Sequence, residues 1–142
     1  MSVKRKIVLA GGVFDILHYG HIHFLKEAKK LGDYLIVALE SDKNVKKLKG
    51  ESRPFHNQKQ RKEILEGMSY VDRVIILKDE MRDRDYEKLV IAISPNIIAV
   101  TKGDKMIEKK KAHAKKAGAK VSEIPLIKTH STTKIAKLLG LE

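Results

Sequence analysis

The 142-residue sequence contains no cysteine, no tryptophan and only three prolines. Without cysteine the chain has no disulfide framework, no thiolate nucleophile and no cysteine-held iron–sulfur site, which fits a reducing compartment. No apolar run approaches the roughly 20 residues that a membrane-spanning helix needs. The basic segment Lys4–Lys6 resembles the start of a signal peptide, but Asp15 and His18 interrupt the apolar stretch behind it. We therefore expect a cytoplasmic protein with no membrane association.

Aromatic residues are also scarce, with three Phe and four Tyr, whereas the formal net charge is +12. Such an excess of Lys and Arg attracts nucleic acid, but few aromatic rings are present to stack on bases. Much of the excess is spread around a predicted helix, as Lys109, Lys110, Lys111, Lys115 and Lys116. A solvated lysine face is the favoured interpretation. A basic nucleic-acid-binding protein remains the non-enzyme alternative.

Several catalytic motifs are absent from the sequence. It contains no Walker A loop, no Gly-x-Gly-x-x-Gly, no Gly-x-Ser-x-Gly and no His-Glu-x-x-His. Kinase, dehydrogenase, hydrolase and zinc-protease functions therefore have no support.

Short apolar segments alternate with stretches of helical periodicity, which predicts an α/β fold with a mostly parallel sheet. The length fits one domain, residues 1–142. The expected strands are 5–10, 34–40, 71–77, 96–101 and 121–124. The expected helices are 19–31, 57–68, one from Asp83 or Asp85 to the residue before Pro95, 105–117, and one that begins at Ser131. This order predicts a Rossmann-like, doubly wound sheet of about five strands.

The second predicted helix has clear start signals. Asn57 is its expected N-cap, Gln60 completes a capping box, and we expect Ile64, Leu65 and Met68 to face the core. The preceding polar segment, residues 41–56, is a candidate lid with a short helical turn at its start. Gly50 and Pro54 prevent a long helix there.

Ligands of open parallel sheets lie beyond the carboxyl ends of the strands, at the point where the winding reverses. Four predicted loops follow strands in this way: 11–21, 40–49, 101–104 and 128–132. We expect them to converge on one cleft.

The most informative segment is Gly11–His21, which follows the first strand and opens the first helix. Glycines allow backbone amides to approach a ligand, and a helix N-terminus attracts anions. His18 and His21 are three residues apart and share one face of the helical turn, whereas His23 points elsewhere. The pattern predicts phosphate binding. Helix capping and zinc ligation stay open as alternatives, although a full zinc ligand set is not evident.

The sequence Gly-Val-Phe-Asp followed by His18-Tyr19-Gly20-His21 resembles the signature of the cytidylyltransferase-like nucleotidyltransferases. The segment Ser131-Thr132-Thr133 resembles the second signature of that family. By itself, Ser131 is placed to cap the last helix. The resemblance implies that Ser131 and Thr132 bind nucleotide phosphates, and that His18, His21 and Lys46 are catalytic. Lys49 is the alternative to Lys46.

The same resemblance implies further nucleotide contacts. Backbone groups are expected from Gly11, Gly12, Val13 and Phe14. Asp15 is expected to orient the loop or an acceptor group. Arg61 is expected to reach a phosphate, or else to pair with Glu63 or Asp72. Lys102, Gly103 and Asp104 form a Lys-Gly-Asp segment, in which Asp104 holds a ribose hydroxyl or caps the next helix.

Differences within the family bear on the substrate. In glycerol-3-phosphate cytidylyltransferases an arginine lies shortly before Ser-Thr-Thr. The corresponding segment here is Leu126-Ile127-Lys128-Thr129-His130, which contains no arginine. The segment from Lys49-Gly50 to Arg53-Pro54 resembles heptose-1-phosphate adenylyltransferases, and His130-Ser131-Thr132 resembles archaeal FAD synthases.

The implied function is nucleotidyl transfer, with ATP favoured over CTP, to the phosphate of a small acceptor. Mg²⁺ is expected to arrive with the triphosphate, with no dedicated protein metal site, and a homodimer is expected. Alternatives are a cytidylyltransferase for glycerol 3-phosphate, an FAD synthase that uses FMN, and a regulatory nucleotide-binding module without catalysis.

Overall fold

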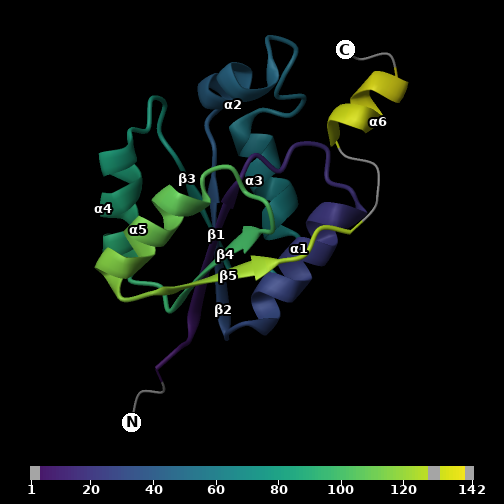
Figure 1. The fold of residues 1–142 in the computed structure, drawn as a ribbon. Coiled ribbons are helices and arrows are strands. Elements are labelled where there is room, and N and C mark those ends of the chain that lie inside the picture. The colour runs from purple at the N-terminus through teal and green to yellow at the C-terminus, as the bar shows by residue number, and fades with distance from the viewer. Residues whose placement is uncertain (1–3, 128–131, 140–142) are drawn as a thin grey trace.

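The computed structural model describes residues 4–127 and 132–139, and the side chains of Thr132 and Thr133 are outside this description. A five-stranded sheet forms the centre of the fold, in the order β3-β2-β1-β4-β5, and all its pairings are parallel (Figure 1). The strands are β1 (Ile7–Gly12), β2 (Tyr34–Leu39), β3 (Arg73–Ile76), β4 (Ile97–Thr101) and β5 (Lys120–Ile124). The winding reverses between β1 and β4. The predicted doubly wound α/β fold is therefore confirmed.

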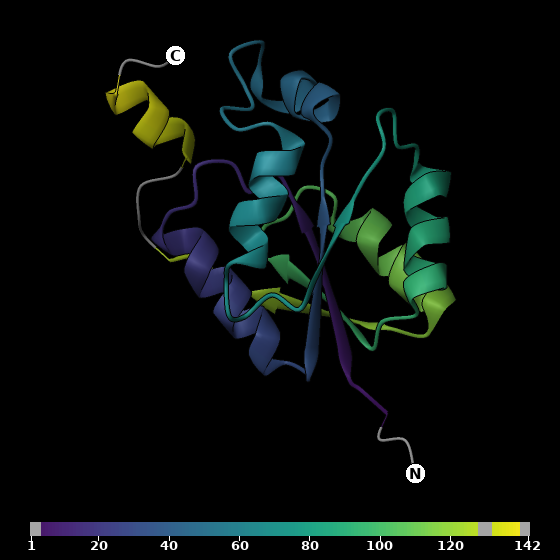
Figure 2. The same cartoon turned by 180° about the vertical axis from the view of Figure 1, so that it is seen from behind.

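Helices cover both faces of the sheet (Figures 1 and 2). One face carries α1 (Tyr19–Lys30) and α3 (Gln58–Glu66), and the other carries α4 (Asp83–Ile93) and α5 (Ile107–Ala117). The short helix α2 (Asp42–Lys49) follows β2 directly, beyond the carboxyl end of that strand. Helix α6 (Thr132–Leu138) lies on the α1 side, away from α4 and α5.

The core consists of two apolar layers, one on each side of the sheet. Successive strand residues point to opposite faces, so Leu35 and Val37 of β2 pack with Leu25 of α1, whereas Ile36 packs with Val90 of α4. Each fully buried side chain of this kind contributes about 1.5–3 kcal/mol relative to an exposed one. This burial on both faces explains why the central strands are continuous apolar runs.

The expected element boundaries agree with the structure within two residues, and the third strand is shorter than expected at both ends. It was expected at 71–77 and spans Arg73–Ile76. The pairing nevertheless continues on both sides, because the N–H of Asp72 donates to Leu35 O at 3.0 Å and that of Leu77 donates to Leu39 O at 3.0 Å.

One local prediction was wrong, and a second predicted too short a helix. Ile64 is 41% exposed, because Arg61 and Leu65, four residues apart, form the buried face of α3. Residues 42–49 form an eight-residue helix rather than a single turn. Ser41 caps it by accepting the N–H of Asn44 at 3.1 Å, and Val45 is fully buried. Asn57 and Gln60 form the expected capping box of α3.

Within residues 4–127 and 132–139, no helix combines the length and the apolar character needed to cross a bilayer.

Candidate active site

A cleft of about 410 Å³ lies at the carboxyl ends of β1 and β4, where the winding of the sheet reverses. Of the predicted site residues, it is lined by Gly11, Gly12, Val13, Phe14, Asp15, His18, His21 and Asp104. Lys46, Arg61, Lys102 and Gly103 do not line it. Ser131 lies outside the described residues, and Thr132 begins α6 with a side chain that is not described.

His18 and His21 build the start of α1 with their rings. Nδ1 of His18 accepts the N–H of Gly20 at 3.0 Å, and Nδ1 of His21 accepts the N–H of His18 at 3.2 Å. The ring centroids are 4.1 Å apart. The two rings therefore cap α1, as one of the open alternatives stated, and both histidines also line the cleft.

This capping also sets the protonation of the two rings. A neutral imidazole whose Nδ1 accepts a hydrogen bond carries its proton on Nε2 and donates from there. Burial lowers the pKa of His18. Burial, with the nearby charges of His18 and Lys49, lowers the pKa of His21 to about 4, although Asp15 opposes the shift. Near neutral pH both rings are therefore neutral N–H donors.

The backbone of the β1–α1 loop (residues 13–18) is tightly constrained. Phe14 and Ile16 have φ values of 47° and 48°, a region that non-glycine residues rarely adopt. The ring of Phe14 packs 5.6 Å from that of His21. A Cβ at Gly12 would lie 2.7 Å from Cε2 of Phe14, so a larger residue there would displace the Phe14 ring.

Asp15 anchors the β1–α1 loop to the segment before α3. Its side chain is buried, and its carboxylate accepts the N–H groups of Phe55 at 2.6 Å and His56 at 3.0 Å and Nε–H of Arg53 at 3.1 Å. Burial alone would raise the pKa of Asp15, but these hydrogen bonds and the Arg53 charge hold the pKa below its usual value. Of the two roles expected for Asp15, this geometry favours orientation of the loop.

Arg53 was not among the predicted site residues, yet it lines the cleft with only 2% of its surface exposed. The available signal was the Arg53-Pro54 pair in the segment that resembles heptose-1-phosphate adenylyltransferases. The pair was recognisable in the sequence, but the arginine had no assigned role there. Only the fold brings Arg53 under the β1–α1 loop.

Lys49, rather than Lys46, lines the cleft. Both belong to α2, and Lys49 is its last residue, next to Gly50 with φ of 105°. Its charge is one cause of the lowered pKa of His21, which places it near that ring. The geometry therefore favours Lys49, the alternative, over Lys46 as the lysine that reaches the cleft.

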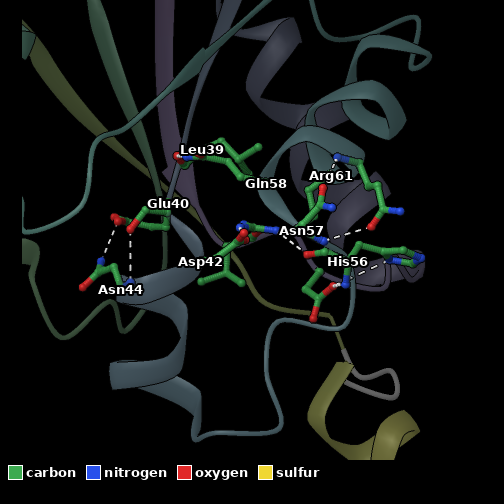
Figure 3. A network of polar contacts seen from close by, with 12 residues as sticks. Leu39, Glu40, Asp42, Asn44, His56, Asn57, Gln58 and Arg61 are labelled. Carbon is green, nitrogen blue, oxygen red and sulfur yellow. Dashed lines mark hydrogen bonds and ion pairs between the residues drawn. The ribbon is translucent and has the colours of Figure 1, made fainter.

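Arg61 requires a correction. Its side chain has no exposed surface, and its guanidinium donates to Val13 O at 2.8 Å. It also donates to His56 O at 3.0 Å and to Oδ1 of Asp42 at 2.7 Å (Figure 3). The expected contact with a phosphate is excluded by this burial. Its acidic partner is Asp42, the first residue of α2, and not Glu63 or Asp72.

On the β4 side of the cleft, Asp104 pairs with Lys110, and both line the cleft. The N–H of Met106 donates to Asp104 at 2.8 Å. Burial would raise the pKa of Asp104, but Lys110 and this N–H lower it overall. Lys110 was assigned to the solvated face, and the structure instead turns it toward the cleft. Lys102 and Gly103 are exposed.

Another wall of the cleft is formed by His23 and Phe24 of α1 and by Pro125, Leu126 and Ile127 after β5. His23 was expected to point elsewhere, so the cleft extends further along α1 than the helical spacing indicated. This wall is largely apolar, in contrast to the basic side near Lys49.

Outside the cleft, Asp83, Glu87 and His113 place possible metal-ligand atoms within 4.8 Å of one another. Their groups already have protein partners, because His113 Nε2 lies 2.9 Å from Asp83 and Lys116 lies 3.1 Å from Glu87. This cluster therefore functions as a polar contact between α4 and α5.

Comparisons with known proteins identify the family of the chain. Residues 9–137 match the family model described as cytidylyltransferase-like. The chain is 40% identical over 143 residues to the FAD synthase of Thermococcus sibiricus, covering 98% of this chain and 94% of the relative. It is 41% identical over 136 residues to the bifunctional protein HldE of Wolinella succinogenes, covering 96% of this chain but only 27% of the relative.

Solved structures show the same likeness. A lipopolysaccharide core biosynthesis protein from Thermoplasma volcanium superimposes with a TM-score of 0.71 at 34% identity, covering 89% of this chain and 99% of that one. A pantoate-beta-alanine ligase from Francisella tularensis, at 17% identity and a TM-score of 0.61 over 88% of this chain and 60% of that one, shares the fold alone. The family match spans the residues that line the cleft, including His18 and His21, and the chain belongs to the cytidylyltransferase-like family of nucleotidyltransferases.

Proposed function

We propose that the chain transfers the adenylyl group of ATP to the phosphate of a small phosphorylated acceptor and releases pyrophosphate. The observation that carries this proposal is the pair His18 and His21, whose Nδ1 atoms are both engaged by backbone N–H groups at the start of α1. Two neutral imidazoles with Nε2–H donors at a helix N-terminus suit a phosphate chain, because the helix dipole and the donors act on the same anion.

In this reaction an oxygen of the acceptor phosphate attacks the α-phosphorus of ATP. The bond from that phosphorus to the oxygen bridging the α- and β-phosphates breaks, and pyrophosphate departs with that oxygen. No covalent enzyme intermediate is needed. The protein contributes by holding two anions together and by stabilising negative charge in the transition state.

The charges of the cleft support this assignment. Lys49 and Arg53 on the α2–α3 side and Lys110 on the β4 side are its described cations, whereas its described carboxylates, Asp15 and Asp104, are bonded to protein donors. The cleft thus offers net positive charge to two phosphate-bearing substrates. We propose that Lys49 neutralises the triphosphate, a role that suits a compact ammonium on a flexible chain.

Magnesium enters this proposal with the nucleotide. Mg²⁺ prefers oxygen ligands, and the described cleft carboxylates already accept hydrogen bonds from Arg53, Lys110 and backbone groups. This donor set does not fit a dedicated protein cage for the ion. We therefore propose that the ion arrives bound to the triphosphate as part of the substrate.

A sugar phosphate is our first candidate acceptor, because the segment from Lys49 to Pro54 resembles heptose-1-phosphate adenylyltransferases and Arg53 of that segment lies in the cleft. FMN is a second candidate. It is favoured by the match to the FAD synthase of Thermococcus sibiricus, which covers 94% of that relative.

The experiment is pyrophosphate release, measured with ATP and with CTP against sugar 1-phosphates, FMN and glycerol 3-phosphate. We expect turnover with ATP and a sugar phosphate or FMN. Turnover with CTP and glycerol 3-phosphate alone would contradict the choice of nucleotide. Binding of ATP without pyrophosphate release from any pair would instead support a regulatory module.

The homodimer and the cytoplasmic location stay predictions. Sedimentation equilibrium measures whether the protein is a homodimer.

A further inference from the structure

Arg61 joins three segments that are far apart in the sequence. Its Nη1 donates to Val13 of the β1–α1 loop. Its Nε donates to His56 before α3, and its Nη2 donates to Asp42 at the start of α2 (Figure 3). All three distances lie between 2.7 and 3.0 Å. A single side chain thus connects the loop that leads to His18 with the helix that ends at Lys49.

The chemistry of these contacts makes them specific for arginine. A fully buried guanidinium needs acceptors for its donors, and its planar fork reaches acceptors in three directions at fixed angles. A lysine at this position keeps the charge but concentrates it at one point, so it cannot serve two carbonyls and a carboxylate in this arrangement. Asp42, in contrast, is 42% exposed, and asparagine has nearly the same size and shape as aspartate, so this substitution leaves no cavity.

The other side-chain hydrogen bonds and ion pairs described for α2 lead away from the β1–α1 loop. Glu40, just before the helix, accepts hydrogen bonds from Asn44 and from Tyr86 of α4. Lys43 pairs with Glu80 at 2.7 Å, on the segment before α4. Among the interactions described for α2, the Asp42–Arg61 pair is therefore the one that continues to Val13.

We propose that Arg61 and Asp42 form a positioning pair that holds α2 against the β1–α1 loop, so that Lys49 and the two histidines act on the same triphosphate. Neither residue touches the substrate. This inference rests on the proposed function for its catalytic consequence, whereas the coupling between α2 and the loop is a property of the free protein.

The main test uses Asp42→Asn, with Glu80→Gln as the matched control that breaks the other ion pair of α2. We expect Asp42→Asn to lower kcat about tenfold, and Glu80→Gln to change it less than about twofold, because the coupling energy of contacting residues is commonly of this size. A tenfold loss in both variants, or in neither, would contradict the positioning role.

A double-mutant cycle separates positioning from general destabilisation. If the pair acts through Lys49, then Asp42→Asn should have an effect of less than about twofold in a Lys49→Ala background. An equal, additive loss in both backgrounds would overturn the proposal. If Arg61→Lys folds, its kcat should be lowered as much as that of Asp42→Asn. The cycle of Asp42→Asn with Lys49→Ala tests the positioning role even if Arg61→Lys does not fold.

Amide hydrogen exchange on the free protein tests the coupling without any substrate. Asp42→Asn should raise exchange in α2 and also in residues 13–18, whereas Glu80→Gln should leave residues 13–18 unchanged. Faster exchange confined to α2 in Asp42→Asn would refute the coupling. If the exchange result is as expected but wild-type protein releases no pyrophosphate from any substrate pair, the proposed function fails and the coupling stands.

Discussion

His18 and His21 hold each other in place at the start of α1, since the ring of His21 accepts the backbone N–H of His18 at 3.2 Å and the two rings lie 4.1 Å apart. The same contact completes the cap of the helix and fixes which ring nitrogen carries the proton. Helix capping and ligand binding therefore depend on the same two side chains.

This relationship allows the two roles of the histidines to be separated. Asparagine at position 18 and glutamine at position 21 retain side-chain oxygens that cap a helix but lack the imidazole. We expect His18→Asn and His21→Gln to lower kcat by about two orders of magnitude, since each removes a donor worth about 3 kcal/mol in the transition state. The melting temperature should change little. Near-normal pyrophosphate release by either folded variant would remove that histidine from the mechanism.

The lysines of α2 provide a second comparison. Lys49→Ala should impair turnover about tenfold or more, because Lys49 lines the cleft and Lys46 and Lys47 do not. Lys46→Ala and Lys47→Ala are matched controls on the same helix. Steady-state pyrophosphate release measures all three. Equal, small effects would mean that no lysine of α2 reaches the triphosphate.

Asp15→Asn should lower the free energy of unfolding at pH 7 by about 3 kcal/mol, because it removes one charge of the buried Asp15–Arg53 ion pair. The folded-state pKa of Asp15 is lowered, so its stabilisation is present above the unfolded pKa near 3.8 and is lost as the pH falls through the folded value. Urea titrations at pH 7 and pH 3 measure the difference between variant and wild type. A difference that does not narrow at low pH would contradict the assignment.

The lowered pKa of His21 predicts that the free energy of unfolding also depends on pH in a less acidic range. Its folded pKa of about 4 lies below the ordinary 6.5, so between these values the unfolded chain binds a proton that the folded chain does not. The free energy of unfolding of the wild type should therefore fall as the pH drops from about 6.5 to about 4. The loss attributable to His21 should be about 2 kcal/mol or less after solvent screening. His21→Gln should lack this part of the slope, and identical slopes in urea titrations of the two proteins would contradict it.

Nucleotide binding separates the enzyme from a nucleic-acid-binding protein. ATP with Mg²⁺ should raise the melting temperature by mass action, whereas binding to DNA or RNA should be weak and steeply salt-dependent. Two lysines of the basic helix α5 are already paired, Lys110 with Asp104 and Lys116 with Glu87. A tight complex with nucleic acid at physiological salt, with no shift from any triphosphate, would make the basic charge the functional feature.

Much of the fold was accessible from local patterns. The alternation of apolar strands with helices predicted a doubly wound sheet, because each pattern reports the period of its own element. The capping box at Asn57 and Gln60 was predicted correctly for the same reason, since a cap depends on residues three positions apart. The helix α2 was underestimated, because part of its stability comes from the burial of Val45, which is a tertiary contact.

The sequence by itself determined where the phosphate-binding motif lies, because the glycines, His18 and His21 act within one strand, loop and helix start. Only the tertiary structure decided which cations reach the cleft. In the folded chain Arg61 is fully buried, whereas Lys49 and Lys110 line the cleft. The physical reason is that the direction of a long basic side chain depends on packing between elements and on acidic partners distant in the sequence, Asp42 for Arg61 and Asp104 for Lys110, which no local period reports.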